Sequence, residues 1–189
     1  MAKILKLGVV LFVFTALTGL ILGGVYTMTL EPISAAKERE KMEAFAETLP
    51  GANDFKVADY QHDQDIIKEI DEGSVKGEIV GYNITVTPKG YGGLIEMVVG
   101  VEKNGRLSGI KILTQNETPG LGANATDPAF SSQFREKDVD KVVVTKVKPT
   151  EENEVQAISG ATITSRAVAE GVNTALEYWA NNLKGEGNN

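Results

Sequence analysis

An uncharged apolar run near the N-terminus is the feature that most constrains the fold of this chain. From Leu7 to Leu30 the sequence contains no Asp, Glu, Lys or Arg, and a helix of about 20 apolar residues is enough to cross the hydrocarbon core of a bilayer. A cleaved signal peptide usually has a shorter apolar stretch of about 7–15 residues, which ends at a small-residue cleavage site. No Ala-x-Ala pattern closes this run. The run therefore predicts a retained transmembrane helix.

The charges on either side of the run predict its orientation. Lys3 and Lys6 precede it and Glu31 follows it, and basic residues stay on the cytoplasmic side of a membrane. We therefore expect a single-pass protein of a bacterial or archaeal cytoplasmic membrane, with its N-terminus inside. The expected segments are a cytoplasmic N-terminus and anchor at residues 1–30, a membrane-proximal helix at 31–50, an extracytosolic domain at 51–184 and a disordered tail at 185–189.

Composition excludes several classes of function. The chain has no Cys, which rules out disulfides, thiolate zinc sites, protein-ligated iron–sulfur clusters and cysteine nucleophiles. The one His, His62, excludes a multi-His metal site, and we expect it in a solvated loop rather than as a ligand. The 19 Lys and Arg against 26 Asp and Glu give a net charge of −7, which argues against a nucleic-acid partner because such proteins need a concentrated basic face. We predict neither a metal site nor a resident catalytic residue.

Hydrophobic periodicity beyond the anchor predicts an α+β domain with a mostly antiparallel sheet and flanking helices. Residues 78–88 alternate and are rich in β-branched types, which predicts a strand, and an Asn-Gly pair at residues 104–105 predicts a hairpin between two later strands. Residues 51–77 are polar and weakly patterned. Strands are expected at residues 78–88, 94–102, 107–114, 142–148 and 155–158, and a short helix at 128–136.

Two longer helices are expected at the ends of this soluble part. Pro32 suits the first position of a helix that Pro50 and Gly51 end, and this helix is expected to continue outward from the membrane segment. Val168, Val172 and Trp179 recur at helical spacing near the C-terminus. Thr164 or Ser165 is expected to cap the start of this last helix.

Two stretches contain Gly, Pro and hydroxyl residues that a plain scaffold does not need. Residues 116–122 (Asn-Glu-Thr-Pro-Gly-Leu-Gly) follow a predicted strand, and a Leu between glycines can lie flat against a planar ligand; on local physics alone a plain turn is the simpler interpretation. Residues 159–165 (Ser-Gly-Ala-Thr-Ile-Thr-Ser) precede the last helix. A helix N-terminus suits a phosphate, although here the simpler local interpretation is a hydroxyl-capped helix start.

These two motifs, together with Tyr91-Gly92-Gly93 before them, resemble the FMN-binding domain of the RnfG family. These proteins are the G subunits of the ion-translocating Rnf electron-transport complex, and NqrC of the sodium-pumping NADH:quinone reductase is similar. The resemblance covers nearly the whole chain, from the anchor to the terminal helix. Three motifs in this order behind one anchor are far more specific than a single Ser-Gly-Ala-Thr.

The resemblance implies a covalently bound cofactor. In this family a separate Mg²⁺-dependent flavin transferase takes FMN from FAD and joins its phosphate to the Thr of the Ser-Gly-Ala-Thr motif, here Thr162. The transferase motif usually has Asp three residues before Ser159, and this chain has Gln156 there. By the same resemblance, the phosphate is surrounded by Ser159, Gly160, Ala161, Thr164 and Ser165, the ring or ribityl chain is contacted by Glu117, Thr118, Gly120, Leu121 and Gly122, and Tyr91 covers one ring face.

The implied function is that of a membrane-anchored electron-transfer protein in an ion-translocating ferredoxin:NAD oxidoreductase. Such a chain is a redox subunit of a translocase, is not catalytic alone, and has the other subunits of the complex as partners. Two alternatives stay open at this point. One is a stand-alone flavinylated shuttle outside the cytosol, and the other is a non-redox anchored scaffold whose hydroxyl motif is only a helix cap.

Overall fold

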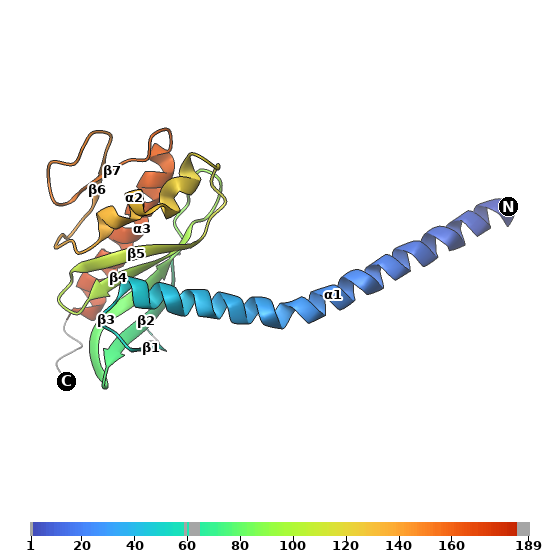
Figure 1. Ribbon diagram of the computed structural model, residues 1–189, viewed down its shortest axis with the longest axis horizontal. Helices are drawn as coiled ribbons and strands as arrows, with labels where there is room; N and C mark the ends of the chain where they lie inside the picture. Colours follow the sequence, from blue (N-terminus) through green and yellow to red (C-terminus); the bar gives the residue numbers. More distant parts are fainter. Residues whose placement is uncertain (1, 59, 61–64, 185–189) are drawn as a thin grey trace. The chain divides into compact units, whose positions relative to one another are not determined.

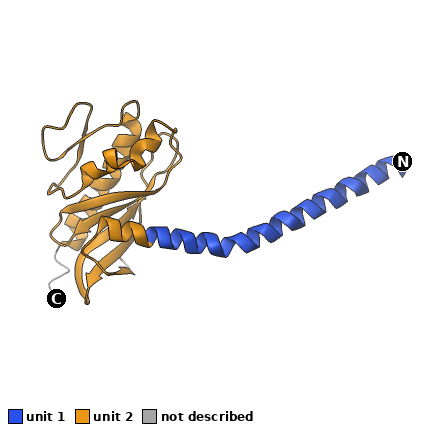
Figure 2. Ribbon diagram, in the orientation of Figure 1, with its two compact units in different colours: residues 1–41 blue, residues 42–189 orange. Residues whose placement is uncertain are grey.

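The chain forms two compact units, residues 1–41 and residues 42–189 (Figure 2). The computed structural model describes residues 2–58, 60 and 65–184. His62 and the tail expected at residues 185–189 lie outside the described residues. Residues 42–189 hold the sheet and the remaining helices, so any site built on them belongs to this second unit.

One helix, α1 (Ala2–Thr48), contains both the predicted membrane segment and the predicted membrane-proximal helix. By length and composition it is the one helix, among the described residues, that is able to cross a membrane. The expected continuation of the second helix outward from the membrane segment is confirmed, and Pro32 lies inside α1 rather than at the first position of a helix. Proline removes a single N–H from the hydrogen-bond ladder, and the Ala- and Glu-rich sequence that follows favours the helix strongly enough to continue it.

Five antiparallel strands follow one another along a single sheet (Figure 1). The expected strands at residues 78–88, 94–102 and 107–114 are confirmed, and the Asn-Gly hairpin joins the last two. The first two strands were not predicted, because register shifts along β2, at Ile67/Glu69 and Gly73/Ser74, break the alternation that would reveal it. The strands are β1 (Asp54–Val57), β2 (Ile67–Val75), β3 (Glu78–Val86), β4 (Glu96–Glu102) and β5 (Leu107–Thr114).

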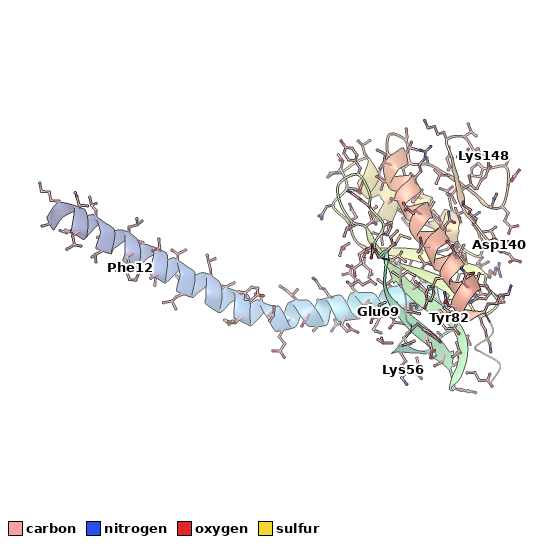
Figure 3. The ribbon with its side chains drawn as sticks, turned by 180° about the vertical axis from the view of Figure 1, so that it is seen from behind. Phe12, Lys56, Glu69, Tyr82, Asp140 and Lys148 are labelled. Carbon is pink, nitrogen blue, oxygen red and sulfur yellow. The ribbon has the colours of Figure 1, made fainter. Side chains whose placement is uncertain are left out.

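The two faces of this sheet are covered by different helices. Helix α3 (Thr162–Tyr178) packs on one face, where Met97 and Val99 of β4 share the main core with Val168 and Val172, and Figure 3 shows α3 lying along the sheet. On the other face Val98 packs with Ala44 and Phe45 of α1. Because neighbouring residues of β4 face opposite helices, the strand is apolar throughout rather than alternating.

The last turns of α1 are fixed to the sheet by polar contacts as well. The Thr48 hydroxyl donates to Asn83 Oδ1 at 2.9 Å, and the Asn83 amide donates to the Phe45 carbonyl at 3.3 Å; both polar side chains are buried. A Cβ on Gly100 would overlap the Thr48 carbonyl oxygen, so glycine is needed there for the close approach of the helix.

After β5 the chain crosses to the start of α3 through short elements. The helix expected at residues 128–136 is confirmed in part as α2 (Pro128–Ser131), capped by Asp127, followed by the 3₁₀ turn η2 (Ser132–Phe134). The strands expected at residues 142–148 and 155–158 form as shorter elements that pair in parallel. The remaining elements are η1 (Gly122–Thr126), β6 (Val143–Thr145), β7 (Glu154–Gln156) and a π-helical turn at Trp179–Leu183.

Candidate functional site

A cavity of about 520 Å³ lies where three separate segments of the chain meet. These segments are the turn around Tyr91, the loop that follows β5 and the start of α3. Its volume falls within the roughly 300–1,000 Å³ typical of small-molecule sites. The lining residues are Tyr91, Glu117, Thr118, Leu121, Gly122, Gly160, Ala161, Thr162, Ile163 and Thr164.

The three motifs singled out in the sequence thus share one cavity, although some of their residues do not line it. Ser159 is exposed outside the lining, and Gly120 and Ser165 also lie outside it. Ile163 lines the cavity but was not among the predicted site residues. The sequence did offer one indication that Ile163 belongs to the site. It lies in the 159–165 motif but outside the Val168 and Val172 stripe that packs on the sheet, so its apolar side chain has no place in the core.

Helix α3 begins at Thr162, whose side chain is half-buried and lines the cavity. The residue before it, Ala161, occupies the N-cap position, and no side chain caps the helix. The expectation that Thr164 or Ser165 is the cap is therefore wrong, because both lie inside the first turns. The N–H groups of a first helical turn have no carbonyl partner within the helix, so this helix start is suited to a ligand that brings oxygen acceptors.

The other two hydroxyl groups in the first turns of α3, those of Thr164 and Ser165, are hydrogen-bonded within the protein. Ser165 is fully buried, donates from Oγ to the Ala161 carbonyl at 2.9 Å and accepts from the Ile158 N–H at 3.0 Å. Thr164 is also buried and donates from Oγ1 to Glu117 Oε2 at 2.5 Å. Within the described part of the chain the Thr162 hydroxyl makes no hydrogen bond, which leaves it open to the cavity.

Glu117 is the carboxylic acid of the cavity wall, and its side chain is only 6% exposed. It accepts a hydrogen bond from the Gly92 N–H on Oε1 at 2.8 Å and the one from Thr164 on Oε2. A single buried carboxyl therefore joins the Tyr91 turn, the loop after β5 and the start of α3. Its role is to assemble the walls as well as to line them.

Glycine is required at positions 160 and 120 for different structural reasons. Gly160 has φ +74°, and a Cβ there would lie 2.9 Å from Leu121 Cδ2, so glycine lets the two motifs touch. Gly120 has φ +75° with open space around it. This glycine permits the turn that exposes Leu121.

The rim of the cavity is apolar and exposed. Tyr91, Leu121 and Ile163 are 73%, 43% and 57% exposed, which is unusual for large apolar side chains grouped around one cavity. Flat aromatic and aliphatic surfaces are suited to a planar ring, and the unpaired N–H groups at the start of α3 are suited to a phosphate. The lining therefore fits a ligand with an anionic end and a planar apolar end, such as FMN.

The position that differs from the transferase motif lies outside this cavity. Gln156 is exposed on β7, and its backbone N–H donates to Gln133 Oε1 at 2.6 Å. The nearby Glu154 is engaged in its own turn, where its Oε2 accepts from the Thr150 N–H at 2.8 Å. Hydrogen bonds from the Thr150 and Glu151 backbone and from the Thr150 hydroxyl hold the pKa of the Glu154 carboxyl below its ordinary value. Glu154 is thus not a free carboxylate in place of the missing Asp.

Comparison with known proteins points to one family. Residues 90–177 match the family model of the FMN-binding domain. The chain is 34% identical to the G subunit of the Na⁺-translocating ferredoxin:NAD⁺ oxidoreductase complex of Acetobacterium woodii, over 94% of this chain and 92% of that protein. It is 37% identical to the G subunit of the proton-translocating ferredoxin:NAD⁺ oxidoreductase complex of Clostridium ljungdahlii, over 85% and 83% of the two chains.

More distant proteins agree with this assignment. The G subunit of the ion-translocating oxidoreductase complex of Methanosarcina acetivorans is 32% identical, over 93% of this chain and 94% of that protein. Among solved structures, the C subunit of the Na⁺-translocating NADH-quinone reductase from Parabacteroides distasonis has a similar fold, with a TM-score of 0.54 and 23% identity over 68% of this chain and 76% of that one. At that identity the likeness concerns the fold alone.

Proposed function

This chain belongs to the family of G subunits of ion-translocating oxidoreductase complexes, and from that membership we propose that it carries FMN covalently on Thr162. It is an electron-transfer subunit of a ferredoxin:NAD oxidoreductase complex, and its residues 90–177 match the FMN-binding domain. The covalent bond is a phosphoester between the FMN phosphate and the Thr162 side chain. The observation that supports this proposal most directly is that the Thr162 hydroxyl lies at the cavity and makes no hydrogen bond among the described residues.

Within the 159–165 motif, only the Thr162 hydroxyl both lines the cavity and lacks a hydrogen bond among the described residues. Ser159 is outside the lining, and the hydroxyl groups of Thr164 and Ser165 are buried and bonded. A phosphodiester at Thr162 keeps one negative charge, which the N–H groups and dipole at the start of α3 stabilise. The attachment residue is thus distinguished from its neighbours by burial and bonding.

The lining residues hold and orient the cofactor, and FMN itself supplies the one- and two-electron chemistry. Gly160 and Ala161 bring the backbone close to the phosphate end. Tyr91, Leu121 and Ile163 contact the ring from the exposed rim. Because this rim faces solvent, the ring lies near the surface, where a partner can exchange electrons with it.

Attachment requires an external enzyme. A free Thr hydroxyl is a weak nucleophile and needs a base or a metal ion to activate it. The lining contains no Lys, Arg or His, and the Glu117 carboxyl accepts from Gly92 and Thr164. A Mg²⁺-dependent flavin transferase is the proposed partner. Thr162 Oγ1 forms the bond to the FMN phosphorus of FAD while its proton passes to a base of the transferase, the pyrophosphate bond breaks, and AMP leaves.

The proposed setting is a cytoplasmic membrane, with α1 as the anchor and the cavity-bearing unit on the extracytosolic side. The uncharged run in α1 and the basic residues before it support this arrangement. The proposed partners are the other subunits of the complex. We further propose the organisation predicted from the sequence, an anchor at residues 1–30, a connecting helix at 31–50 and an FMN-binding domain at 51–184.

The test is covalent flavin on the full chain after co-expression with a flavin transferase. Thr162→Val keeps the β-branched shape and removes the hydroxyl, so in-gel flavin fluorescence after denaturation is expected to disappear. Ser159→Ala is the matched control, since it removes an exposed hydroxyl three residues away, and it is expected to keep its fluorescence. Fluorescence retained in Thr162→Val would place the attachment site at another residue. An absence of fluorescence in the wild-type chain would favour the scaffold alternative.

A further inference from the structure

Glu117 is a buried acid without a cation at the wall of the proposed flavin cavity. Its side chain is 6% exposed, and within the described part of the chain it makes no ion pair. None of the residues that line the cavity is Lys, Arg or His. A buried charge is normally paired or strongly hydrogen-bonded, and Glu117 is held by hydrogen bonds without a cation beside it.

Hydrogen bonds from two directions hold the carboxyl in place. The Gly92 N–H donates to Oε1 at 2.8 Å, and the Thr164 hydroxyl donates to Oε2 at 2.5 Å. Both contacts use the carboxyl oxygens as hydrogen-bond acceptors. Thr164 also belongs to the first turn of α3, whose positive end favours a negative charge nearby.

Two glycines make room for this arrangement. A Cβ on Gly122 would lie 2.5 Å from Glu117 Oε2 and 2.6 Å from Thr164 Oγ1, and a Cβ on Gly90 would overlap Glu117 Oε1. The carboxyl therefore lies close to the backbone of Gly122 through Oε2 and to that of Gly90 through Oε1. Its position relative to the cavity is set by the fold and not by the side chain's own flexibility.

We propose that Glu117 is a positioning residue whose fixed negative charge lowers the reduction potential of the flavin held in this cavity. This inference rests on the proposed function, because it needs FMN in the cavity. Reduction of the flavin by two electrons and one proton leaves one additional negative charge on the cofactor. A charge of the same sign at the cavity wall opposes that addition, and it does so more strongly in a partly desolvated site than in water.

The experiment is a potentiometric titration of the flavinylated full chain in detergent, followed by visible absorbance at neutral pH. Glu117→Gln keeps the size of the side chain and removes its charge, so its midpoint potential is expected to shift to a more positive value. Glu117→Asp keeps the charge while disturbing both hydrogen bonds, and it is expected to stay closer to the wild-type potential. Glu170→Gln, at an exposed position of α3 outside the cavity lining, is expected to leave the potential unchanged.

The outcomes separate this inference from the proposed function. A wild-type chain without covalent flavin overturns the proposed function, whereas flavinylated Glu117→Gln at the wild-type potential overturns only the role of Glu117. Equal positive shifts in Glu117→Gln and Glu117→Asp also overturn it, because packing rather than charge then sets the potential. If Glu117→Gln does not fold, Glu117→Ala provides the second test, because it removes the same charge: a more positive potential is expected, and an unchanged or more negative potential contradicts the proposal.

Discussion

Gly122 shows how one residue without a side chain can be needed for the wall of the cavity. Its φ is not in the positive region, and its importance comes from space: the nearest atoms to an added Cβ are the interacting oxygens of Glu117 and Thr164. Any side chain at this position must push those two groups apart. The glycine is therefore part of the hydrogen-bonded link that closes the cavity wall.

We expect Gly122→Ala to destabilise the chain by about 1–3 kcal/mol, the usual cost of overpacking a closed site. Thermal unfolding of the full chain measures this loss, and flavin occupancy is expected to fall with it. Gly51→Ala is the control, because a Cβ at Gly51 has open space and no positive φ to adopt. A Gly122→Ala chain as stable as Gly51→Ala would mean that Glu117 and Thr164 separate without cost.

At the scale of elements, the end of α1 is attached to the sheet by an ion-pair network as well as by packing. Glu47 lies 2.7 Å from Lys111 of β5 and 3.0 Å from Arg135, which follows η2. The hydrogen bond from Lys111, with the charges of Lys111 and Arg135, holds the pKa of the Glu47 carboxyl below its ordinary value, against the opposing effect of partial burial. One acid thus links three elements at the face opposite α3.

This network predicts a pH dependence of stability. Because the folded-state pKa of Glu47 is lowered, its contribution is present above the ordinary Glu pKa of about 4.3 and is lost as the pH falls through the folded-state value. Glu47→Gln is expected to lower the unfolding free energy by up to about 1 kcal/mol at pH 7, and this difference is expected to shrink below the ordinary Glu pKa and to vanish once the pH is below the folded-state pKa of Glu47.

The control for this measurement is Glu43→Gln. Glu43 is exposed on the same helix and makes no ion pair within the described part of the chain. Thermal unfolding of the two variants beside the wild-type chain at pH 7 and at low pH gives the comparison. A Glu47→Gln difference that persists unchanged at low pH would assign the effect to packing instead of charge.

At the scale of the whole molecule, the proposed orientation decides on which side of the membrane the second unit lies. The chain contains no Cys, so one introduced thiol reports its own location. Lys148→Cys is at an exposed position of the second unit (Figure 3), and it is expected to react with a membrane-impermeant thiol reagent in intact cells. Ala2→Cys, before the apolar run, is expected to react only after lysis; the reverse pattern would overturn the proposed orientation.

The sequence by itself determined the features that depend on local pattern. The uncharged run predicted the long apolar helix α1, and apolar, β-branched runs with an Asn-Gly turn predicted β3, β4 and β5. The Ser-Gly-Ala-Thr and Pro-Gly-Leu-Gly motifs, with Tyr91-Gly92-Gly93, pointed to the segments that line one cavity. Periodicity and turn chemistry act over a few residues, so they can be recognised without the fold.

Only the tertiary structure decided how these segments act on one another. β1 and β2 are recognised by pairing, because bulges in β2 remove its alternation and β1 is short. The Glu117 and Thr164 side chains are 47 positions apart, and no local pattern shows that one accepts a hydrogen bond from the other. That contact decides which hydroxyl stays open, Thr162, and it exists because the loop after β5 and the start of α3 meet at one cavity. Hydrogen bonds between distant side chains depend on where the backbone places them, which is a property of the folded chain.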